Sequence, residues 1–203
     1  MKKIIFIPIL VLFCILSTSA QDIVLPKPVK TGGMPLMDAL SKRQTIREFS
    51  SADIDNQMLS NLLWAAWGYN RDDKRTAPSS MNYQELDLYV VKKSGAYLYD
   101  ARNNKLIQIS NKDLRKETGS QAFVAIAPIN IVFVSDQTKG GGASAVNSGF
   151  ISQNIYLFCA SEDLATVVRG GFDSKTLNKV LNLKQTQVPV LTQTIGKKTS
   201  SDK

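Results

Sequence analysis

The stretch SAVNSGFISQNIYLFCASE, residues 144–162, decides how the rest of this sequence is interpreted. It carries no charged side chain before Glu162, and apolar residues such as Phe150, Ile151 and Ile155 lie on most of its sides when it is drawn as a helix. A helix that is apolar on most sides is normally buried inside a domain. The stretch therefore predicts a long, buried central helix around which the other elements pack.

Helical spacing also marks the segments that precede it. A first helix is expected from Leu36 toward Arg43, and a second where apolar residues recur three and four positions apart between Ile54 and Trp67. Asp53 stands where a side chain caps the start of the second helix, which ends near Gly68. Residues 69–84 hold charges, a proline and small polar residues, so they predict a surface loop.

Apolar runs rich in β-branched residues predict the strands. Before the central helix they span 86–91, 96–100, 105–109 and 130–135, and after it 165–168 and 188–195, with a helix expected from 173 to 181. Residues 101–104 join the second strand to the third as a hairpin. Because strands and helices are mixed instead of strictly alternating, we expect an α+β fold, a central mixed or antiparallel sheet flanked by helices.

The first twenty residues have the form of an export signal. A basic start is followed by the apolar run 4–16 and by small residues that end at Ala20. A membrane span needs about 20 apolar residues, so an uncleaved anchor is the alternative to a cleaved signal. We expect residues 1–20 to be a signal peptide and residues 21–203 to be a single exported, periplasmic domain with no stable membrane insertion after cleavage.

Composition excludes several classes of protein. The sequence has 203 residues, with 25 Lys and Arg, 17 Asp and Glu, and no histidine, which rules out Ser-His-Asp and Cys-His hydrolases and histidine-ligated metal sites. Demanding chemistry must then come from a cofactor. The basic residues are dispersed, so we expect no nucleic-acid partner, and a phosphorylated small ligand accounts for the excess. Only Cys159 lies outside the signal, which excludes an intrachain disulfide and predicts a buried thiol.

Three short segments carry side chains able to hold a ligand. The first is KRQTIREF at 42–49, in which the forks of Arg43 and Arg47 suit phosphate oxygens or a flavin carbonyl and Thr45 adds a hydroxyl between them. The alternative is a basic helix end favoured by the helix dipole. The second is PSSMNYQ at 78–84, a run of donors and acceptors that can hydrogen-bond the polar edge of a planar ring. The alternative is a solvated turn.

The third segment is RGGFD at 169–173, between a strand and a helix. Its glycines let the backbone approach a flat ligand, although a plain turn with Asp173 as helix cap explains it equally. It is not a dinucleotide-binding fingerprint, because no G-x-G-x-x-G is present.

In this order along the chain, the motifs resemble the FMN-dependent nitroreductase family. They comprise R-x-T-x-R-x-F at 43–49, P-S-S-x-N-x-Q at 78–84, the pair at 153–154 in the central helix, G-G-F-D at 170–173 and a closing Ile195-Gly196. The resemblance covers about 36–197. LLWAAWG at 62–68 further resembles the branch that contains the oxidases and dehydrogenases of thiazole and oxazole peptide maturation.

The resemblance implies an intertwined homodimer with FMN at the subunit interface. Arg43 and Thr45 would hold the phosphate, Arg47 would lie near the pyrimidine end of the flavin, and Ser80 and Asn82 would reach it from the other subunit. The backbone at Gly170 and Gly171 would approach N5, and Lys197 with Lys198 would supplement the phosphate site. The cofactor-binding residues implied in this way are Arg43, Gln44, Thr45, Arg47, Pro78, Ser79, Ser80, Asn82, Arg169, Gly170, Gly171 and Lys197.

The function implied is transfer of electrons from NAD(P)H or another donor to a nitroaromatic, a quinone or a related small acceptor by a ping-pong mechanism. The chain departs from the family in three respects. Gly170 stands where many members have glutamate or another residue, and the C-terminal arm is short. Export is also unusual for an enzyme expected to use NAD(P)H, which is scarce outside the cytoplasm. The alternatives are therefore an exported module that binds a flavin or another phosphorylated ligand without turnover, and a purely structural dimer.

Overall fold

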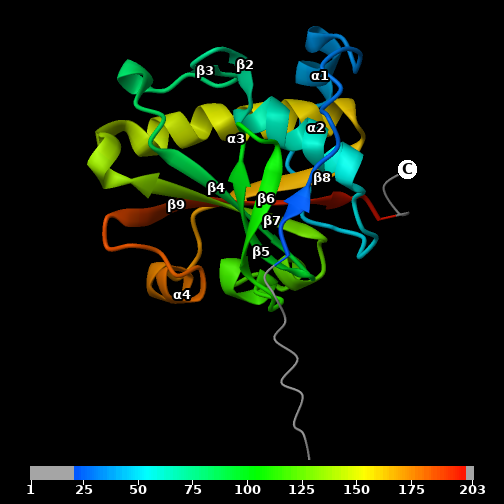
Figure 1. Ribbon diagram of the computed structural model, residues 1–203. Coiled ribbons are helices and arrows are strands. Elements are labelled where there is room, and N and C mark those ends of the chain that lie inside the picture. Colours follow the sequence, from blue (N-terminus) through cyan, green and yellow to red (C-terminus); the bar gives the residue numbers. More distant parts are fainter. Residues whose placement is uncertain (1–20, 200–203) are drawn as a thin grey trace, which may run out of the picture.

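One antiparallel sheet of seven strands runs through the protein, and helices lie on both of its faces (Figure 1). The computed structural model describes residues 21–199, so the expected export signal lies outside the described part of the chain. The strands are β1 Ile23–Val24, β4 Leu86–Lys92, β5 Gly95–Asp100, β6 Lys105–Ser110, β7 Ile129–Asp136, β8 Leu164–Arg169 and β9 Gln187–Lys197. Their spatial order is β1-β6-β5-β4-β7-β9-β8. Every pairing is antiparallel, so of the mixed and antiparallel sheets that the sequence allowed, the antiparallel one is present.

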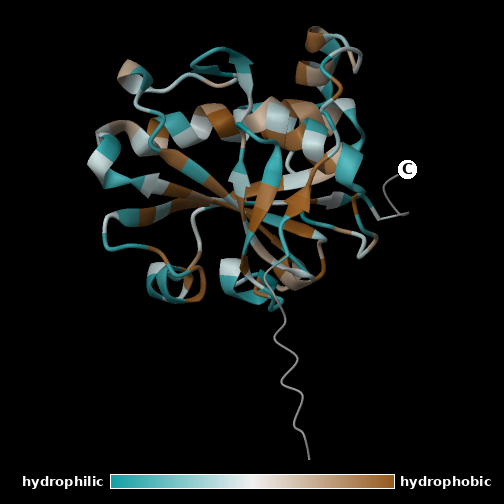
Figure 2. Ribbon diagram, viewed as in Figure 1, coloured by the Kyte–Doolittle hydropathy of each residue, from teal (hydrophilic) through white to brown (hydrophobic). Residues whose placement is uncertain are grey.

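Each face of the sheet is covered by helices. Helices α1 (Leu36–Lys42), α2 (Asn56–Trp67) and α3 (Ser144–Ser161) lie on one side, and α4 (Ser174–Val180) on the other. Side chains of β7 alternate between the two layers: Ile131 and Phe133 pack with α2 and α3, whereas Val132 and Val134 pack with α4. A strand that is buried on both faces has no polar alternation, so its sequence is a continuous apolar run. Figure 2 shows this concentration of apolar residues in the central strands.

Helix α3 is as long as predicted, but the outer side of its N-terminal half is exposed instead of buried. Ile151 and Ile155 are fully buried against the sheet. On the outer side, however, Val146 and Phe150 are 60% and 43% exposed, while the small polar side chain of Ser148 is completely buried. The apolar composition of the stretch therefore has two origins, an inner side that faces the core and an outer side that faces out of this chain.

Two local predictions are wrong. Helix α2 begins at Asn56, and its capping residue is Asp55, whose carboxylate accepts a hydrogen bond from the backbone N–H of Met58 at 2.8 Å. Asp53 lies before the helix and accepts from the backbone N–H of Ile54 instead. Residues 69–84 are not simply a loop, since they contain a hairpin of β2 (Tyr69–Arg71) and β3 (Lys74–Arg75) and a 3₁₀ turn, η1 (Ser80–Asn82).

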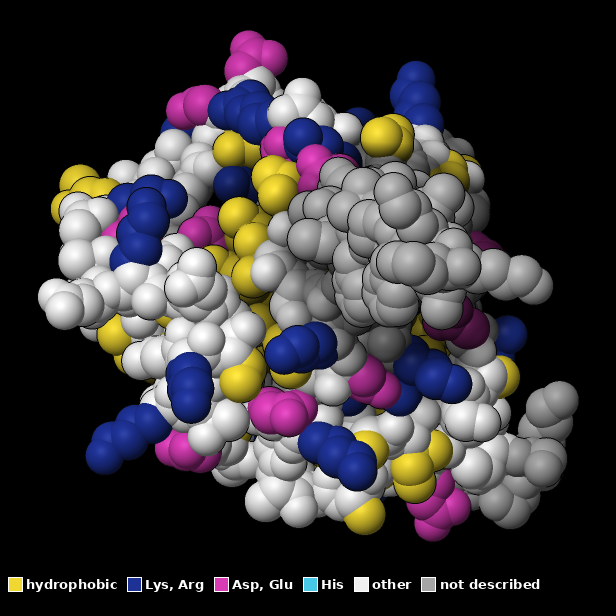
Figure 3. Space-filling view, turned by 60° about the horizontal axis from the view of Figure 1, so that its bottom comes forward, with side chains coloured by type: hydrophobic (Ala, Val, Ile, Leu, Met, Phe, Trp, Pro, Cys, Tyr) yellow, Lys and Arg dark blue, Asp and Glu magenta, His cyan; other side chains and the backbone are white. Residues whose placement is uncertain are grey.

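The distribution of surface charges and the burial of the thiol agree with the composition. On the face shown in Figure 3, Lys and Arg side chains lie scattered among Asp and Glu side chains, as they do along the sequence. Within residues 21–199, no helix combines the length and the hydropathy that crossing a bilayer requires. Cys159 is buried as predicted, at 1% exposure, and burial raises the pKa of its thiol.

Candidate functional site

The segment between α1 and α2 runs along the edge of the sheet beside β8. The backbone N–H of Ile46 donates to the carbonyl of Thr166 at 3.0 Å, and that of Ser50 donates to the carbonyl of Lys197 at 2.9 Å. Ile46 and Phe49 pack against the apolar side chains of β8. With these two side chains turned inward, the polar residues of the same segment are left at the surface, where Thr45 and Arg47 are exposed.

This segment forms one wall of a pocket whose other wall is α3. Arg43, Gln44 and Ile46 line it from one side, Tyr156 from the helix, and Lys198 from the end of the chain. A second hollow shares Gln44, Ile46 and Lys198 and adds Thr45, Arg47 and Glu48. We call these two adjoining hollows the cationic pocket. The first has a volume of about 270 Å³ and the second about 400 Å³, and a complete small-molecule site typically has roughly 300–1,000 Å³.

The hydroxyl of Tyr156 links the walls of the cationic pocket. It accepts a hydrogen bond from the backbone N–H of Val168 at 3.1 Å and lies 3.0 Å from Oγ1 of Thr45. When the tyrosine donates its own proton to Thr45, the threonine hydroxyl hydrogen points away from Tyr156. The guanidinium of Arg43 lies over the Tyr156 ring, 5.3 Å from its centroid. Tyr156 was missed by the sequence analysis, although a tyrosine in an otherwise apolar helix needs a polar partner for its hydroxyl.

The charge of the cationic pocket is only partly compensated. Among residues 21–199, neither the Arg43 nor the Arg47 guanidinium lies within ion-pair distance of a carboxylate. Lys198 is held by Asp163, with 2.5 Å between Nζ and Oδ1. The predicted Lys197 lines a different hollow, together with Ile54 and Met58, whereas Lys42 and Lys198 line the cationic pocket. Two unpaired guanidinium groups beside a hydroxyl suit an anion such as phosphate.

The second candidate segment, 78–84, lies at the other end of α3. The backbone N–H of Ser80 donates to Oδ1 of Asn147 at 3.2 Å, and Asn147 donates in turn to the fully buried Glu85 at 2.7 Å. Asn147 and Tyr156 are nine residues apart on one helix, which separates them by about 13 Å along its axis. Within one chain, Pro78, Ser79, Ser80 and Asn82 are therefore not brought together with the cationic pocket.

The third candidate segment divides between the interior and the surface. Arg169 is only 5% exposed, and it donates to the carbonyl of Thr118 and Oγ1 of Thr194 at 2.9 Å and to Oδ1 of Asn130 at 3.2 Å. Burial lowers the pKa of this guanidinium to about 10. It therefore belongs to a buried network beneath the surface. Gly170 and Gly171 are open, since an added Cβ at either position would meet no atom within 4 Å.

Comparisons with known proteins identify the family of this chain. The model of the Nitroreductase family matches residues 40–197. A protein of Methanocaldococcus jannaschii that carries the nitroreductase name is 28% identical over 183 residues, which cover 80% of this chain and 91% of that protein.

Solved structures show the same fold. The crystal structure of a Ralstonia eutropha protein assigned as a nitroreductase is 39% identical, with a TM-score of 0.84 over 91% of this chain and 93% of that chain. A chain of the Escherichia coli microcin synthetase McbBCD complex is 15% identical, with a TM-score of 0.66 over 84% of this chain and 76% of that chain. At that identity the likeness shows the fold alone, so placement in the thiazole and oxazole branch stays a prediction. From the match over residues 40–197 and the shared fold, the chain belongs to the nitroreductase family.

Proposed function

We propose that this protein is an exported, homodimeric oxidoreductase that binds FMN between its subunits. The observation that carries the proposal is the cationic pocket, in which Arg43 and Arg47 stand without a carboxylate partner beside the hydroxyl of Thr45. Buried or clustered guanidinium groups are normally paired, and a phosphate supplies the missing charge.

The residues present fit this cofactor. Arg43 and Thr45 would bind the phosphate, with the Tyr156 hydroxyl fixing the direction of the threonine hydroxyl. Arg47 would face the pyrimidine end of the ring system. The space outside Gly170 and Gly171 leaves room for a flat group to lie against the backbone.

A second subunit is needed to complete such a site. In one chain the polar loop 78–84 contacts Asn147, which lies about 13 Å along α3 from Tyr156 in the cationic pocket. The outer side of α3 exposes Val146 and Phe150, and the adjacent loop exposes Met81 at 81%. Exposed apolar side chains gathered in this way mark a protein–protein interface. Packing α3 against a second copy would cover them and would bring loop 78–84 of one chain toward the cationic pocket of the other.

When bound, FMN supplies the electron transfer, from NAD(P)H or another donor to a nitroaromatic, a quinone or a related acceptor in ping-pong order. The protein contributes binding and orientation, because a chain without histidine holds no imidazole to move protons. The arginines bind and orient the cofactor, and the open backbone at Gly170 and Gly171 leaves one face accessible to donor and acceptor in turn.

The first experiment is an absorption spectrum of the purified mature protein. We expect a yellow protein whose flavin bands bleach under dithionite, and uptake of added FMN by any colourless fraction. Arg43→Ala should weaken FMN binding about ten- to a hundredfold, the cost of one charge-assisted hydrogen bond. The matched control is Arg71→Ala, which removes an exposed arginine of β2 and should leave FMN affinity unchanged. A colourless protein that takes up no FMN would reject the proposal.

The dimer has a separate test. Val146→Glu and Phe150→Glu place a charge on the outer side of α3 without touching the core, since both side chains are exposed in one chain. Each variant should shift the mass measured by light scattering from two copies toward one, and should release FMN. Dimers of unchanged mass would place the subunit interface elsewhere.

A non-catalytic role for the same site is favoured by one observation. Lys198, one of the two lysines that line the cationic pocket, is neutralised by Asp163, so it adds little charge for binding a phosphate. A module of this kind would bind a flavin or another phosphorylated ligand without turnover. Steady-state NAD(P)H oxidation with menadione or a nitrofuran, above the background of free FMN, separates the two roles.

Export is tested by N-terminal sequencing of the periplasmic protein, which should begin at Gln21.

A further inference from the structure

The side-chain carboxamide of Gln84 uses its full hydrogen-bonding capacity. Its Oε1 accepts from Nε of Arg75 at 2.9 Å and from the hydroxyl of Tyr69 at 3.3 Å. Its Nε2 donates to the backbone carbonyl of Asp73 at 2.5 Å and to Oδ1 of Asn82 at 3.0 Å. A carboxamide has two donor hydrogens and one oxygen with two lone pairs, so every hydrogen-bonding position of Gln84 is filled.

The chemistry of these partners allows only one orientation of the Gln84 amide. Arg75 can only donate and the Asp73 carbonyl can only accept. Exchanging Oε1 and Nε2 would set donor against donor and acceptor against acceptor. The remaining hydrogen of Nε2 then requires an acceptor, so it is Oδ1 of Asn82 that faces Gln84. The amide nitrogen of Asn82 is left facing away from Gln84, with one hydrogen directed to the Asp73 carboxylate at 3.5 Å.

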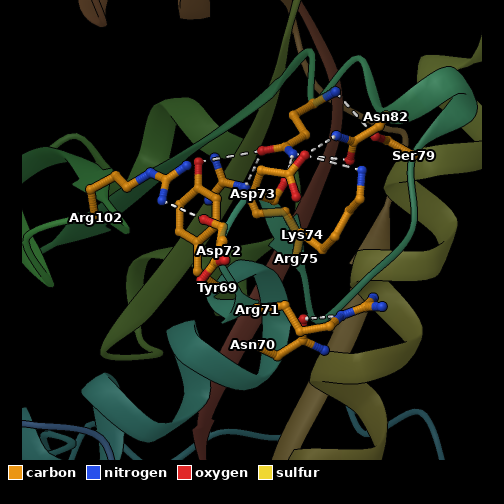
Figure 4. Close-up of polar contacts among 11 residues, drawn as sticks. Tyr69, Asn70, Arg71, Asp72, Asp73, Lys74, Arg75, Ser79, Asn82 and Arg102 are labelled. Carbon is orange, nitrogen blue, oxygen red and sulfur yellow. Dashed lines mark hydrogen bonds and ion pairs between the residues drawn. The ribbon is translucent and has the colours of Figure 1, made fainter.

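Arg75 is itself held firmly, so it anchors this chain of hydrogen bonds. Its guanidinium lies 4.1 Å from the centroid of the Tyr69 ring and 4.8 Å from that of Trp67, and it donates to the Trp67 carbonyl at 2.8 Å. Arg102 lies 3.7 Å from the same Tyr69 ring. Figure 4 shows Asp73 and Arg75 of the β2–β3 hairpin converging with Asn82 of the neighbouring loop.

The backbone of the loop is held in an unusual conformation. Met81, Asn82 and Gln84 have φ values of +50°, +58° and +48°, and none of them is glycine. Left-handed residues other than glycine cost about 1–2 kcal/mol each and persist only where surrounding contacts impose them. The backbone N–H of Gln84 supplies one such contact by donating to Oγ of Ser79 at 3.1 Å. The loop is therefore preformed before any ligand arrives.

We propose that Gln84 is a positioning residue that fixes the side chain of Asn82 as a hydrogen-bond donor toward the flavin held by the partner subunit. This inference rests on the proposed function, because Asn82 acts on a flavin only if loop 78–84 reaches the neighbouring cationic pocket. The polar edge of a flavin ring is rich in acceptors, with two carbonyl oxygens and unprotonated ring nitrogens. A donor presented by Asn82 matches any of these acceptors, whereas a reversed amide could pair only with the single ring N–H, at N3.

The test is Gln84→Glu in the full mature protein. The carboxylate still accepts from Arg75 and Tyr69, so the anchor is kept, but it has no hydrogen to give to Asn82. Asn82 should turn over, donate its nitrogen to the carboxylate and present its oxygen outward. We expect FMN to bind about tenfold more weakly. The thermal unfolding temperature should fall as well, because the carboxylate also loses the bond to the Asp73 carbonyl and faces it acceptor to acceptor, so FMN affinity is measured well below the unfolding transition. Gln185→Glu adds the same charge in an exposed loop and should not change FMN affinity.

A double-mutant cycle decides whether Gln84 acts through Asn82. Asn82→Ala alone should weaken FMN binding about tenfold, and adding Gln84→Glu to it should have no further effect. A full tenfold loss from Gln84→Glu in the Asn82→Ala background would overturn the proposal. If Gln84→Glu does not fold, Gln84→Met removes the four hydrogen bonds without adding charge. It should weaken binding about threefold, and again only when Asn82 is present.

A measurement without flavin separates this inference from the proposed function. In nitrogen-15 spectra of the flavin-free protein, the side-chain NH₂ protons of Asn82 should move downfield and exchange more slowly in Gln84→Glu, because they exchange the long 3.5 Å contact with the Asp73 carboxylate for a close bond to the introduced carboxylate. Unchanged Asn82 resonances would overturn the inference even if FMN binds. A wild-type protein that binds no FMN would defeat the proposed function, while these resonances would still report the orientation that Gln84 imposes.

Discussion

Substitution of Gly119 by alanine should strongly destabilise the protein, although its backbone is in an extended conformation that any residue adopts. Gly119 has φ 172° and ψ 169°, so the substitution causes no backbone strain. An alanine Cβ built there would lie 1.9 Å from Nη1 of Arg169. Atoms cannot approach so closely, and the guanidinium must move.

The magnitude follows from what holds the guanidinium in place. Nη1 donates to the Thr118 carbonyl at 2.9 Å, and Nη2 donates to Oγ1 of Thr194 at 2.9 Å and to Oδ1 of Asn130 at 3.2 Å. Moving Nη1 breaks at least the first of these bonds and leaves a charged donor and a carbonyl unpaired in the interior. A hydrogen bond to a charged group contributes about 1.5–3 kcal/mol, so we expect Gly119→Ala to cost roughly 2–4 kcal/mol.

Urea unfolding followed by tryptophan fluorescence measures this cost. The control is Gly170→Ala, where an added Cβ meets nothing within 4 Å and the change should stay within about 0.5 kcal/mol. Arg169→Met removes the clashing atoms. In that background Gly119→Ala should cost less than about 1 kcal/mol, although Arg169→Met is itself destabilising. An equal cost of Gly119→Ala in both backgrounds would refute the reasoning, because the clash with Arg169 would then not be its cause.

Three further predictions concern the caps and the buried titratable groups. Asp55→Ala should lower the free energy of unfolding by about 1 kcal/mol through loss of the bond from Met58 N–H, whereas Asp53→Ala, outside the helix, should cost less in the same urea assay. Burial raises the pKa of Asp87 above 3.8, so the folded protein binds the extra proton more tightly and loses stability as the pH rises through the raised pKa. Asp87→Asn should therefore stabilise the protein at pH 7 and bring no gain below pH 3.8, which unfolding curves at both pH values will show. Because burial raises the pKa of the Cys159 thiol, it should react with a disulfide reagent at pH 8 only after denaturation, and rapid reaction in the native protein would contradict its buried position.

Sequence reasoning was most successful where the signal is local. The strands at the centre of the sheet and helices α3 and α4 were predicted because apolar runs and helical spacing report which side of an element is covered. Reasoning of the same kind failed for the cap of α2, since Asp53 and Asp55 are both good capping residues and only the geometry of the entering chain chooses between them. It also missed the β2–β3 hairpin, whose two short strands carry mostly polar and charged side chains.

In the candidate site, too, the residue types could be predicted from the sequence but their contacts could not. The arginines and hydroxyls of the segment 42–49 were recognisable from residue type and spacing, and so were the polar loop and the paired glycines. Their surroundings were not, because Thr45 meets Tyr156 across 111 positions of the sequence and Arg169 meets Thr118 across 51. Contacts over such separations exist only after the chain has closed into its sheet.

By itself, the sequence determined the central strands and the main helices, the α+β class and the family resemblance, because each depends on residue types at short, regular spacing. Only the tertiary structure decided that Lys198 and Tyr156 line the cationic pocket, that Arg169 is buried, and that Gln84 orients Asn82. It also divided the apolar residues of α3 between an inner side and an outer side. The physical reason is that hydrophobicity determines how strongly a side chain favours burial away from water. Which residues or which subunit bury it depends on the three-dimensional path of the whole chain.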